Sequence, residues 1–368
     1  MENSTQIVSF VLTAYGNIGH MRYLFFTILI SSYLSIICAN ILLIGVICGE
    51  RTLHEPMYLF LCGLFVNELY GSTAIFPCLI TQMFSDTHEV SFIFCLLQLF
   101  CLYTYVSVEY CSLAAMAYDR YVSICYPLHY SIIMTTGKVY AILLLVWVYC
   151  FTKSTVTMFI VAHLKFCGNL IDKVFCDPNK MACSILAVKS TFTVVVGFVS
   201  FTVPSILILF SYIKILAVCL RTSKESRQKA LRTCTPHIVC LTNIVIACSF
   251  EVLQTKFEMT QVPSPVRVIL SVYLLICQPF LSPIIYGLKI TKIRNLCKDV
   301  LQKVKEGASR LLSPPLSSPP PPRAALILPI QAPDGIGAEN AVRRTSSDAS
   351  ASGPLLNSQP DHQEQISA

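Results

Sequence analysis

Seven long apolar stretches, separated by short polar segments, are the feature that most constrains what this chain can fold into. They lie at approximately 23–48, 57–83, 92–118, 139–162, 190–218, 236–255 and 266–288. Each is long enough to cross the hydrocarbon core of a bilayer as a helix, which takes about 20 residues. Only 13% of the 368 residues are charged, about half the share typical of a soluble domain. Composition alone would allow six or eight crossings, but the stretches predict an all-α membrane protein, a seven-transmembrane helix bundle.

Basic residues between the stretches predict the orientation of the chain. Most Lys and Arg lie in four segments, 49–56, 119–138, 219–235 and 289–305. By the positive-inside rule these segments face the cytosol, so we expect the N terminus outside and the C terminus in the cytosol. The net charge of +7 follows from these loops and calls for no nucleic-acid partner. Asn3, on the predicted outer side, begins an N-glycosylation sequon.

Composition divides the chain into four parts. Residues 1–22 are a predicted extracellular N terminus, and 23–288 the seven-helix domain. In 289–305 apolar residues recur at helical spacing with lysines between them, which predicts an amphipathic cytosolic helix on the inner membrane surface. Residues 306–368 are rich in Pro and Ser, and we expect them to form a disordered cytosolic tail.

Two carboxylates lie inside predicted helices, where ionisable side chains are costly and functional by default. Glu68 lies about 18 Å along its helix from Pro56 at the cytosolic end, and Glu109 about 16 Å from Arg120. Asn40 is about 12 Å from its own inner end by the same helix rise. The two acids predict either a shared site for a sodium ion or a proton, or a neutral hydrogen-bonded pair that only locks the packing. No other metal or cofactor is expected.

Most of the 18 cysteines lie inside predicted helices, where Cys acts as a small apolar residue. Four are expected outside the cell. Cys95 lies about 37 Å from Arg120 along one helix, and Cys167, Cys176 and Cys183 lie in the loop between the fourth and fifth stretches. Four cysteines in an oxidising compartment predict two disulfides, for which three pairings are possible.

The end of the third stretch carries the most specific motif. Residues 116–130 read MAYDRYVSICYPLHY and resemble the MAYDRYVAIC-PLHY stretch of olfactory receptors, a branch of the rhodopsin-like (class A) G-protein-coupled receptors. Other family motifs stand in the expected order: Pro56-Met57-Tyr58, Ser211-Tyr212, KALRTCTPH at 229–237 and Pro283-Ile284-Ile285-Tyr286. The resemblance covers about residues 20–300, and the wording at 67–70 and 286–289 is most similar to fish odorant receptors.

The resemblance implies an activation switch at the cytosolic end. Arg120 would pair with Asp119 at rest and meet a G protein when active, and two tyrosines would move in to support that state. The residues implied for G-protein coupling and the switch are Asp119, Arg120, Tyr121, Tyr212, Pro283 and Tyr286. Ser282 departs from the family pattern, because the class usually has Asn before this proline, and the departure weakens the expected sodium cage.

The resemblance also implies roles for the cysteines and acids. It pairs Cys95 with Cys176, and Cys167 with Cys183. Glu68 takes the place of an Asp found in most receptors of the class, and Glu109 matches an acid characteristic of odorant receptors.

In this family the odorant lies in the outer half of the bundle, against the third, fifth and sixth helices. Leu102 stands where amine receptors carry Asp, which disfavours a biogenic amine. Each matching position can also be ordinary bundle packing. The matching positions are Leu102, Tyr103, Val106, Ser107, Ser200, Cys248, Ser249 and Val252.

The function implied is an odorant receptor, not an enzyme, that senses a small, water-soluble odorant and activates a heterotrimeric G protein of the olfactory, stimulatory type, raising cAMP. Receptor kinase and arrestin are further expected partners beside the lipid bilayer, and the expected location is the plasma membrane of olfactory cilia. The alternative is a non-sensory class A receptor for a peptide or lipid. A transporter should show internal repeats or paired broken helices, and the sequence has neither.

Overall fold

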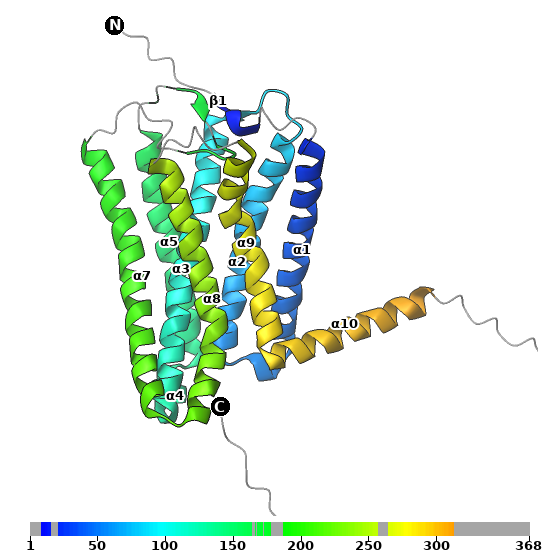
Figure 1. Cartoon of the computed structure of the whole chain (residues 1–368), viewed down its shortest axis with the longest axis vertical. Helices are drawn as coiled ribbons and strands as arrows, with labels where there is room; N and C mark the ends of the chain where they lie inside the picture. Colours follow the sequence, from blue (N-terminus) through cyan, green and yellow to red (C-terminus); the bar gives the residue numbers. More distant parts are fainter. Residues whose placement is uncertain are drawn as a thin grey trace, which may run out of the picture. The chain divides into compact units, whose positions relative to one another are not determined.

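A computed structural model describes residues 9–15, 21–163, 166, 168–171, 173–177, 187–256 and 264–312. Seven long helices run side by side (Figure 1). They are α1 (Met21–Gly49), α2 (Pro56–Gln82), α3 (Phe92–Cys125), α5 (Thr136–Ala162), α7 (Ala187–Arg221), α8 (Lys224–Lys256) and α9 (Ser264–Lys289). Within the described residues, the first six of these contain segments long and apolar enough to cross a membrane. The predicted all-α seven-transmembrane bundle is confirmed.

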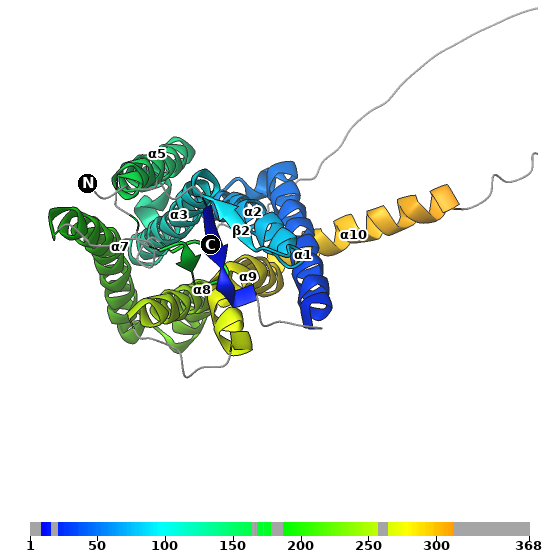
Figure 2. The same cartoon turned by 90° about the horizontal axis from the view of Figure 1, so that it is seen from above.

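Shorter elements close the two ends of the bundle. Three strands, β1 (Ser9–Leu12), β2 (Glu89–Ser91) and β3 (Leu170–Ile171), form a sheet in the order β2-β1-β3 (Figure 2). β1 is antiparallel to β2 and parallel to β3. We call the end of the bundle that carries this sheet the Cys95 end, and the opposite end the Arg120 end. The other short elements are η1 (Thr13–Tyr15), η2 (Arg51–Leu53), η3 (Pro127–His129) and α4 (Tyr130–Ile133). A longer helix, α10 (Thr291–Leu312), follows α9.

The third helix organises the packing, because α3 contacts α2, α5, α7 and α8. Gly71 of α2 lies against the ring of Tyr105 of α3 so closely that a Cβ there would clash with it. Buried apolar side chains form one large cluster toward the Cys95 end, around Phe76 and Leu99, and a second toward the Arg120 end, around Phe65 and Leu113. Many large apolar side chains are exposed on the outward faces, as expected of helices surrounded by lipid.

Several helices extend beyond the stretches predicted from hydropathy. α3 ends at Cys125 rather than near 118, and α8 begins at Lys224, twelve residues before Pro236. α10 ends at Leu312, seven residues beyond the predicted limit of 305. Apolarity marks where a helix crosses the membrane, whereas backbone hydrogen bonding lets a helix continue into polar surroundings. Pro236 is accommodated inside α8, so a proline did not mark the start of the helix.

Candidate functional site

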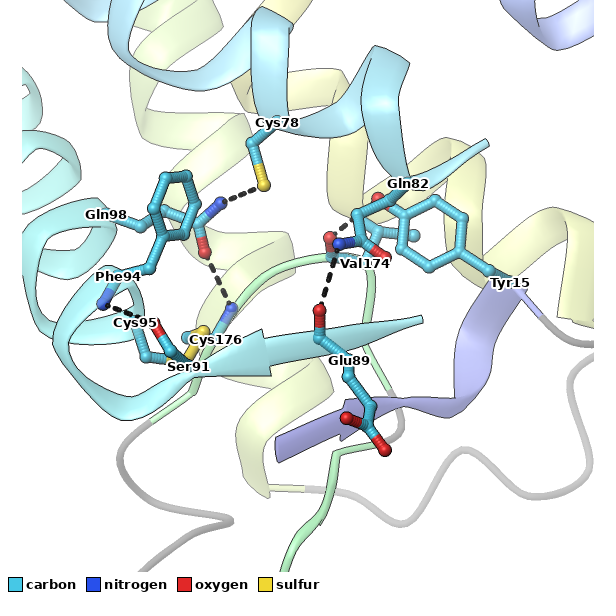
Figure 3. Close-up of a disulfide and its surroundings, with 10 residues drawn as sticks. All are labelled: Tyr15, Cys78, Gln82, Glu89, Ser91, Phe94, Cys95, Gln98, Val174 and Cys176. Carbon is cyan, nitrogen blue, oxygen red and sulfur yellow. Dashed lines mark hydrogen bonds between the residues drawn. A yellow bond between two sulfur atoms is a disulfide. The ribbon is translucent and has the colours of Figure 1, made fainter. Parts of the chain in front are cut away.

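At the Cys95 end, a disulfide joins Cys95 at the start of α3 to Cys176, 81 residues further along the chain. Gln98, one turn after Cys95, fixes the same segment because its Oε1 accepts a hydrogen bond from the Cys176 backbone N–H at 3.0 Å (Figure 3). The Gln98 amide also donates to the Cys78 Sγ of α2 at 3.4 Å. The bridge matches the pairing implied by the resemblance. Cys167, Cys183 and Asn3 lie outside the described residues.

In the middle of the bundle, Glu109 of α3 is fully buried and accepts two amide hydrogen bonds. Asn67 of α2 donates to its Oε2 at 2.9 Å, and Gln278 of α9 donates to its Oε1 at 2.9 Å. The Gln278 Oε1 accepts in turn from Asn243 of α8 at 2.6 Å, and Tyr273 donates to Asn243 at 2.8 Å. Four helices are therefore linked by one polar layer.

The second acid, Glu68 of α2, is also fully buried and lies close enough to Glu109 for the two carboxyls to interact electrostatically. The Tyr105 hydroxyl donates to its Oε2 at 2.9 Å. The Asn40 amide does not donate to either acid. It donates to the backbone oxygens of Ile36, at 2.9 Å, and Pro279, at 3.2 Å.

Two buried oxygens of this layer, Glu68 Oε1 and Asn67 Oδ1, accept no hydrogen bond within the described part of the chain. Carboxylate and amide oxygens are the ligands that hard cations prefer. The residues present therefore fit a sodium ion, and they fit a bound proton equally. The described residues contain no group of three or more His, Cys, Asp or Glu side chains that would suit a transition metal.

At the Arg120 end, the Arg120 guanidinium bonds to the Asp119 carboxylate through Nε, at 3.0 Å, and through Nη2. Tyr130 of α4 donates to the other oxygen of Asp119 at 2.8 Å. Burial and the Asp119 carboxylate raise the pKa of Tyr130, so its hydroxyl remains a donor across the physiological range. The Arg120 side chain is 13% exposed and that of Asp119 1%. The arginine is held by its own neighbour in the chain.

The other residues expected in the switch surround this pair. Tyr212 of α7 bonds to His237 Nδ1 of α8, and His237 Nε2 lies 2.9 Å from the Leu113 backbone oxygen of α3. Tyr286 of α9 is buried, and its hydroxyl is among the described groups without a hydrogen-bond partner. Pro283 is buried one turn earlier, whereas Tyr121 is half-buried and faces the Tyr126 and Phe210 rings. His237 belongs to the motif at 229–237, but the motif does not predict its bond to Tyr212.

The expected ligand positions lie on α3, α7 and α8 and differ in their burial. Leu102 is buried, and Tyr103, Val106, Ser107 and Ser200 are half-buried. Cys248 is half-buried on α8 and Ser249 is exposed there, while the Val252 side chain is outside the described residues. Ser249 donates to the Val245 backbone oxygen of its own helix at 2.7 Å.

Sequence reasoning missed the partners that surround the predicted site residues. Asn67, Gln278 and Asn243 are buried and bonded in the polar layer, and Lys153 of α5 donates to Ser107 of α3. The available signal was the presence of polar side chains within apolar stretches, since such residues are functional candidates by default.

Comparisons with known proteins show the family of the chain. The family model of olfactory receptors matches residues 29–304. The chain is 32% identical over 308 residues to olfactory receptor 6B1 of Homo sapiens, covering 81% of this chain and 96% of that protein. It is 31% identical to olfactory receptor 11A1 of Homo sapiens, covering 80% and 94%, and 31% identical to olfactory receptor 4B13 of Mus musculus, covering 80% and 96%.

The fold is that of a class A G-protein-coupled receptor, a multi-pass protein of the plasma membrane. Within that class, this chain belongs to the olfactory receptor family. The family is not enzymatic, and its members sense odorants and couple to G proteins.

Proposed function

We propose that this receptor detects a small, water-soluble odorant between α3, α7 and α8 and signals through a stimulatory G protein that raises cAMP. The N terminus and the Cys95 end are outside the cell, and the Arg120 end faces the cytosol of an olfactory cilium. The observation that carries the proposal is the ion pair between Arg120 and Asp119, which keeps the arginine engaged at the end of α3.

Activation in this proposal is a shift between two states of the bundle. In the resting state Asp119, supported by Tyr130, holds Arg120. In the active state Arg120 is free to meet the G protein, and Tyr212 and Tyr286 move inward beside it. Tyr286 is suited to this role because its buried hydroxyl has no partner among the described residues. An odorant drives the shift only by binding the active state more tightly.

The mid-membrane acids are proposed to hold a sodium ion or a proton that stabilises the resting bundle. Glu68 Oε1, Asn40 Oδ1 and Asn67 Oδ1 are buried oxygens that accept no hydrogen bond from the described residues, and Glu109 is held in place by two amides. Sodium titration of receptor activity, with and without Glu109→Gln, separates the two occupants. A sodium response that Glu109→Gln removes supports the ion, and no sodium response in either protein excludes it.

Further parts of the proposal concern the surface of the receptor. α10 packs against α9 and α1, and Lys292 bonds to the Thr52 backbone oxygen at 2.6 Å. The apolar face of α10 suits the inner membrane surface. Receptor kinase and arrestin would act on the cytosolic side. Cys167–Cys183 would form the second disulfide, and Asn3 would carry a glycan.

The test is to express the full chain with a cAMP reporter and to screen water-soluble odorants. We expect a concentration-dependent response that Tyr103→Ala weakens while surface labelling stays unchanged. Tyr140→Ala, an exposed tyrosine on α5, is the matched control. A response to peptides or lipids but to no odorant would contradict the proposal.

A further inference from the structure

Lys153 is a cation near the middle of the membrane. It belongs to α5, and its Nζ donates a hydrogen bond to Ser107 Oγ of α3. Ser107 lies about 18 Å from Cys95 and about 20 Å from Arg120 along α3 by helix rise. The lysine therefore enters the bundle at about half its depth, between two helices that lie side by side in both views (Figures 1 and 2).

In the part of the chain that the structure describes, the surroundings of Lys153 supply no carboxylate. Ionisable side chains at this depth are costly and are normally paired. Among the described residues, no carboxylate lies within ion-pair distance of Lys153. The acids at a similar depth are engaged elsewhere, Glu109 by two amides and Glu68 by a tyrosine. Lys153 does not extend its amine toward the membrane surface, as a snorkelling lysine would, because the amine reaches inward to the hydroxyl of Ser107.

A second hydroxyl contact joins α5 to α7 one turn before Lys153 along α5. Tyr149, one turn before Lys153, lies with its hydroxyl 3.4 Å from Ser200 Oγ of α7. Ser107 is half-buried and one turn from Tyr103 on α3. Ser107 and Ser200 are also proposed odorant contacts. The ammonium group therefore bonds directly to one residue of the proposed ligand site.

We propose that Lys153 anchors the acidic group of a carboxylate-bearing odorant. The carboxylate accepts from the ammonium, which Ser107 positions, while the carbon skeleton packs against Leu102 and Val106. The Ser107 hydroxyl itself donates to the Tyr103 backbone oxygen at 2.6 Å. The ligand thereby supplies a counter-charge that the described residues around Lys153 lack. The inference rests on the proposed function, because it names the chemical class of the odorant. Lys153 is a binding residue that the family-derived set of positions does not include.

The experiment compares carboxylic acids with uncharged analogues of the same skeleton. A panel of aliphatic, aromatic and amino acids is tested on the full receptor beside the methyl ester and the primary alcohol of each member. The variants are Lys153→Gln, which removes the charge, and Lys153→Arg, which keeps it. Lys138→Gln, an exposed lysine on the same helix, is the matched control. Surface labelling corrects every response for expression.

We expect acids to be more potent than their esters. Lys153→Gln should raise the half-maximal acid concentration by at least about tenfold, as expected for the loss of one partner of a desolvated charge pair. Lys153→Arg should restore most of the potency, and Lys138→Gln should leave it unchanged. Responses to esters that equal those to acids, or an acid response that Lys153→Gln does not shift, would overturn the inference.

A second measurement separates this inference from the proposed function. The thermal stability of the purified receptor is followed with each acid and ester, without any G protein. Stabilisation by acids that requires Lys153 supports the anchor even if no odorant raises cAMP. A cAMP response to neutral odorants alone, with no acid-dependent stabilisation, supports the odorant receptor and overturns the anchor. No response and no stabilisation in either assay would contradict both.

Discussion

The two ends of the bundle restrain the same helix in different ways. At the Cys95 end, a disulfide joins α3 to a segment 81 residues away, and the three-stranded sheet buries Phe10 and Leu12 completely beside it. At the Arg120 end, α3 carries an ion pair between adjacent residues, supported by the hydroxyl of Tyr130. One end is fixed by a covalent bond and the other by contacts that can exchange. The difference suits a receptor that receives its ligand on a stable frame and changes shape where it signals.

The polar layer between the two ends belongs to the stable part. Glu109 is bonded to amides from α2 and α9, and Gln278 continues the chain of bonds to Asn243 of α8. Buried polar groups linked in this way specify one arrangement of the helices, because breaking one bond leaves other groups without partners. We therefore expect variants in this layer to act mainly on stability and on any response to sodium, and variants around Arg120 to act mainly on basal signalling.

The largest effect is expected for Cys176→Ser. Opening a loop of 81 residues removes about 4 kcal/mol of stability by the chain-entropy relation. The receptor should be largely lost from the cell surface, as measured by surface labelling. Cys38→Ser, at an exposed free cysteine, is the control and should be expressed normally. Normal surface levels of Cys176→Ser would remove the covalent restraint from the comparison.

Glu109→Leu should cost about 2 kcal/mol of stability, because the buried amides of Asn67 and Gln278 would each lose an acceptor. They would keep only the Tyr105 backbone oxygen and the Ser282 hydroxyl. Thermal unfolding of the purified receptor measures the loss. Glu109→Gln keeps one acceptor oxygen and should lose less. Equal unfolding temperatures for the two variants would show that the hydrogen bonds contribute little to the stability of the layer.

Asp119→Asn removes the charge that holds Arg120. The lost charge-assisted bonds are worth about 2 kcal/mol, which shifts the equilibrium between the two states by up to about thirtyfold, so the basal cAMP level should rise by at least about tenfold without odorant. Asp86→Asn, at an exposed aspartate near the Cys95 end, should leave the basal level unchanged. A basal level that stays low at normal expression would argue against the ion pair as the resting restraint.

Tyr130→Phe is expected to have the smallest effect of this series. It removes one hydrogen bond to Asp119, worth about 1 kcal/mol, and should raise the basal cAMP level by up to about fivefold. The same substitution at exposed Tyr140 is the control. A larger effect than that of Asp119→Asn would reverse the order of importance proposed for the Arg120 end.

Most of the architecture could be predicted because the signal is local. Apolar stretches mark the helices, and the helix rise places Glu68 and Glu109 at the same depth. Contacts that depend on the rotation of one helix against another could not be predicted in this way. The bond between Lys153 and Ser107 is one example.

Contacts between segments that lie far apart in the chain could not be predicted from the sequence alone either. β1 is four residues long, and its partners lie in β2 and β3, far along the chain. Gln98 is one polar residue among many in α3, and only the folded chain shows that it bonds to the Cys176 backbone. Such residues carry no periodic pattern, so their roles depend on where the rest of the chain lies.

The most direct test of the comparison is a pair of distances measured with and without an activating odorant. Spectroscopic labels carried by unnatural amino acids avoid the 18 cysteines. One pair of labels, at Tyr118 of α3 and Leu231 of α8, reports on the Arg120 end. The other pair, at Ile93 of α3 and Val195 of α7, reports on the Cys95 end. All four side chains are exposed. We predict that the odorant lengthens the first distance by several ångströms and leaves the second nearly unchanged. Equal changes at both ends, or a change confined to the Cys95 end, would contradict the account.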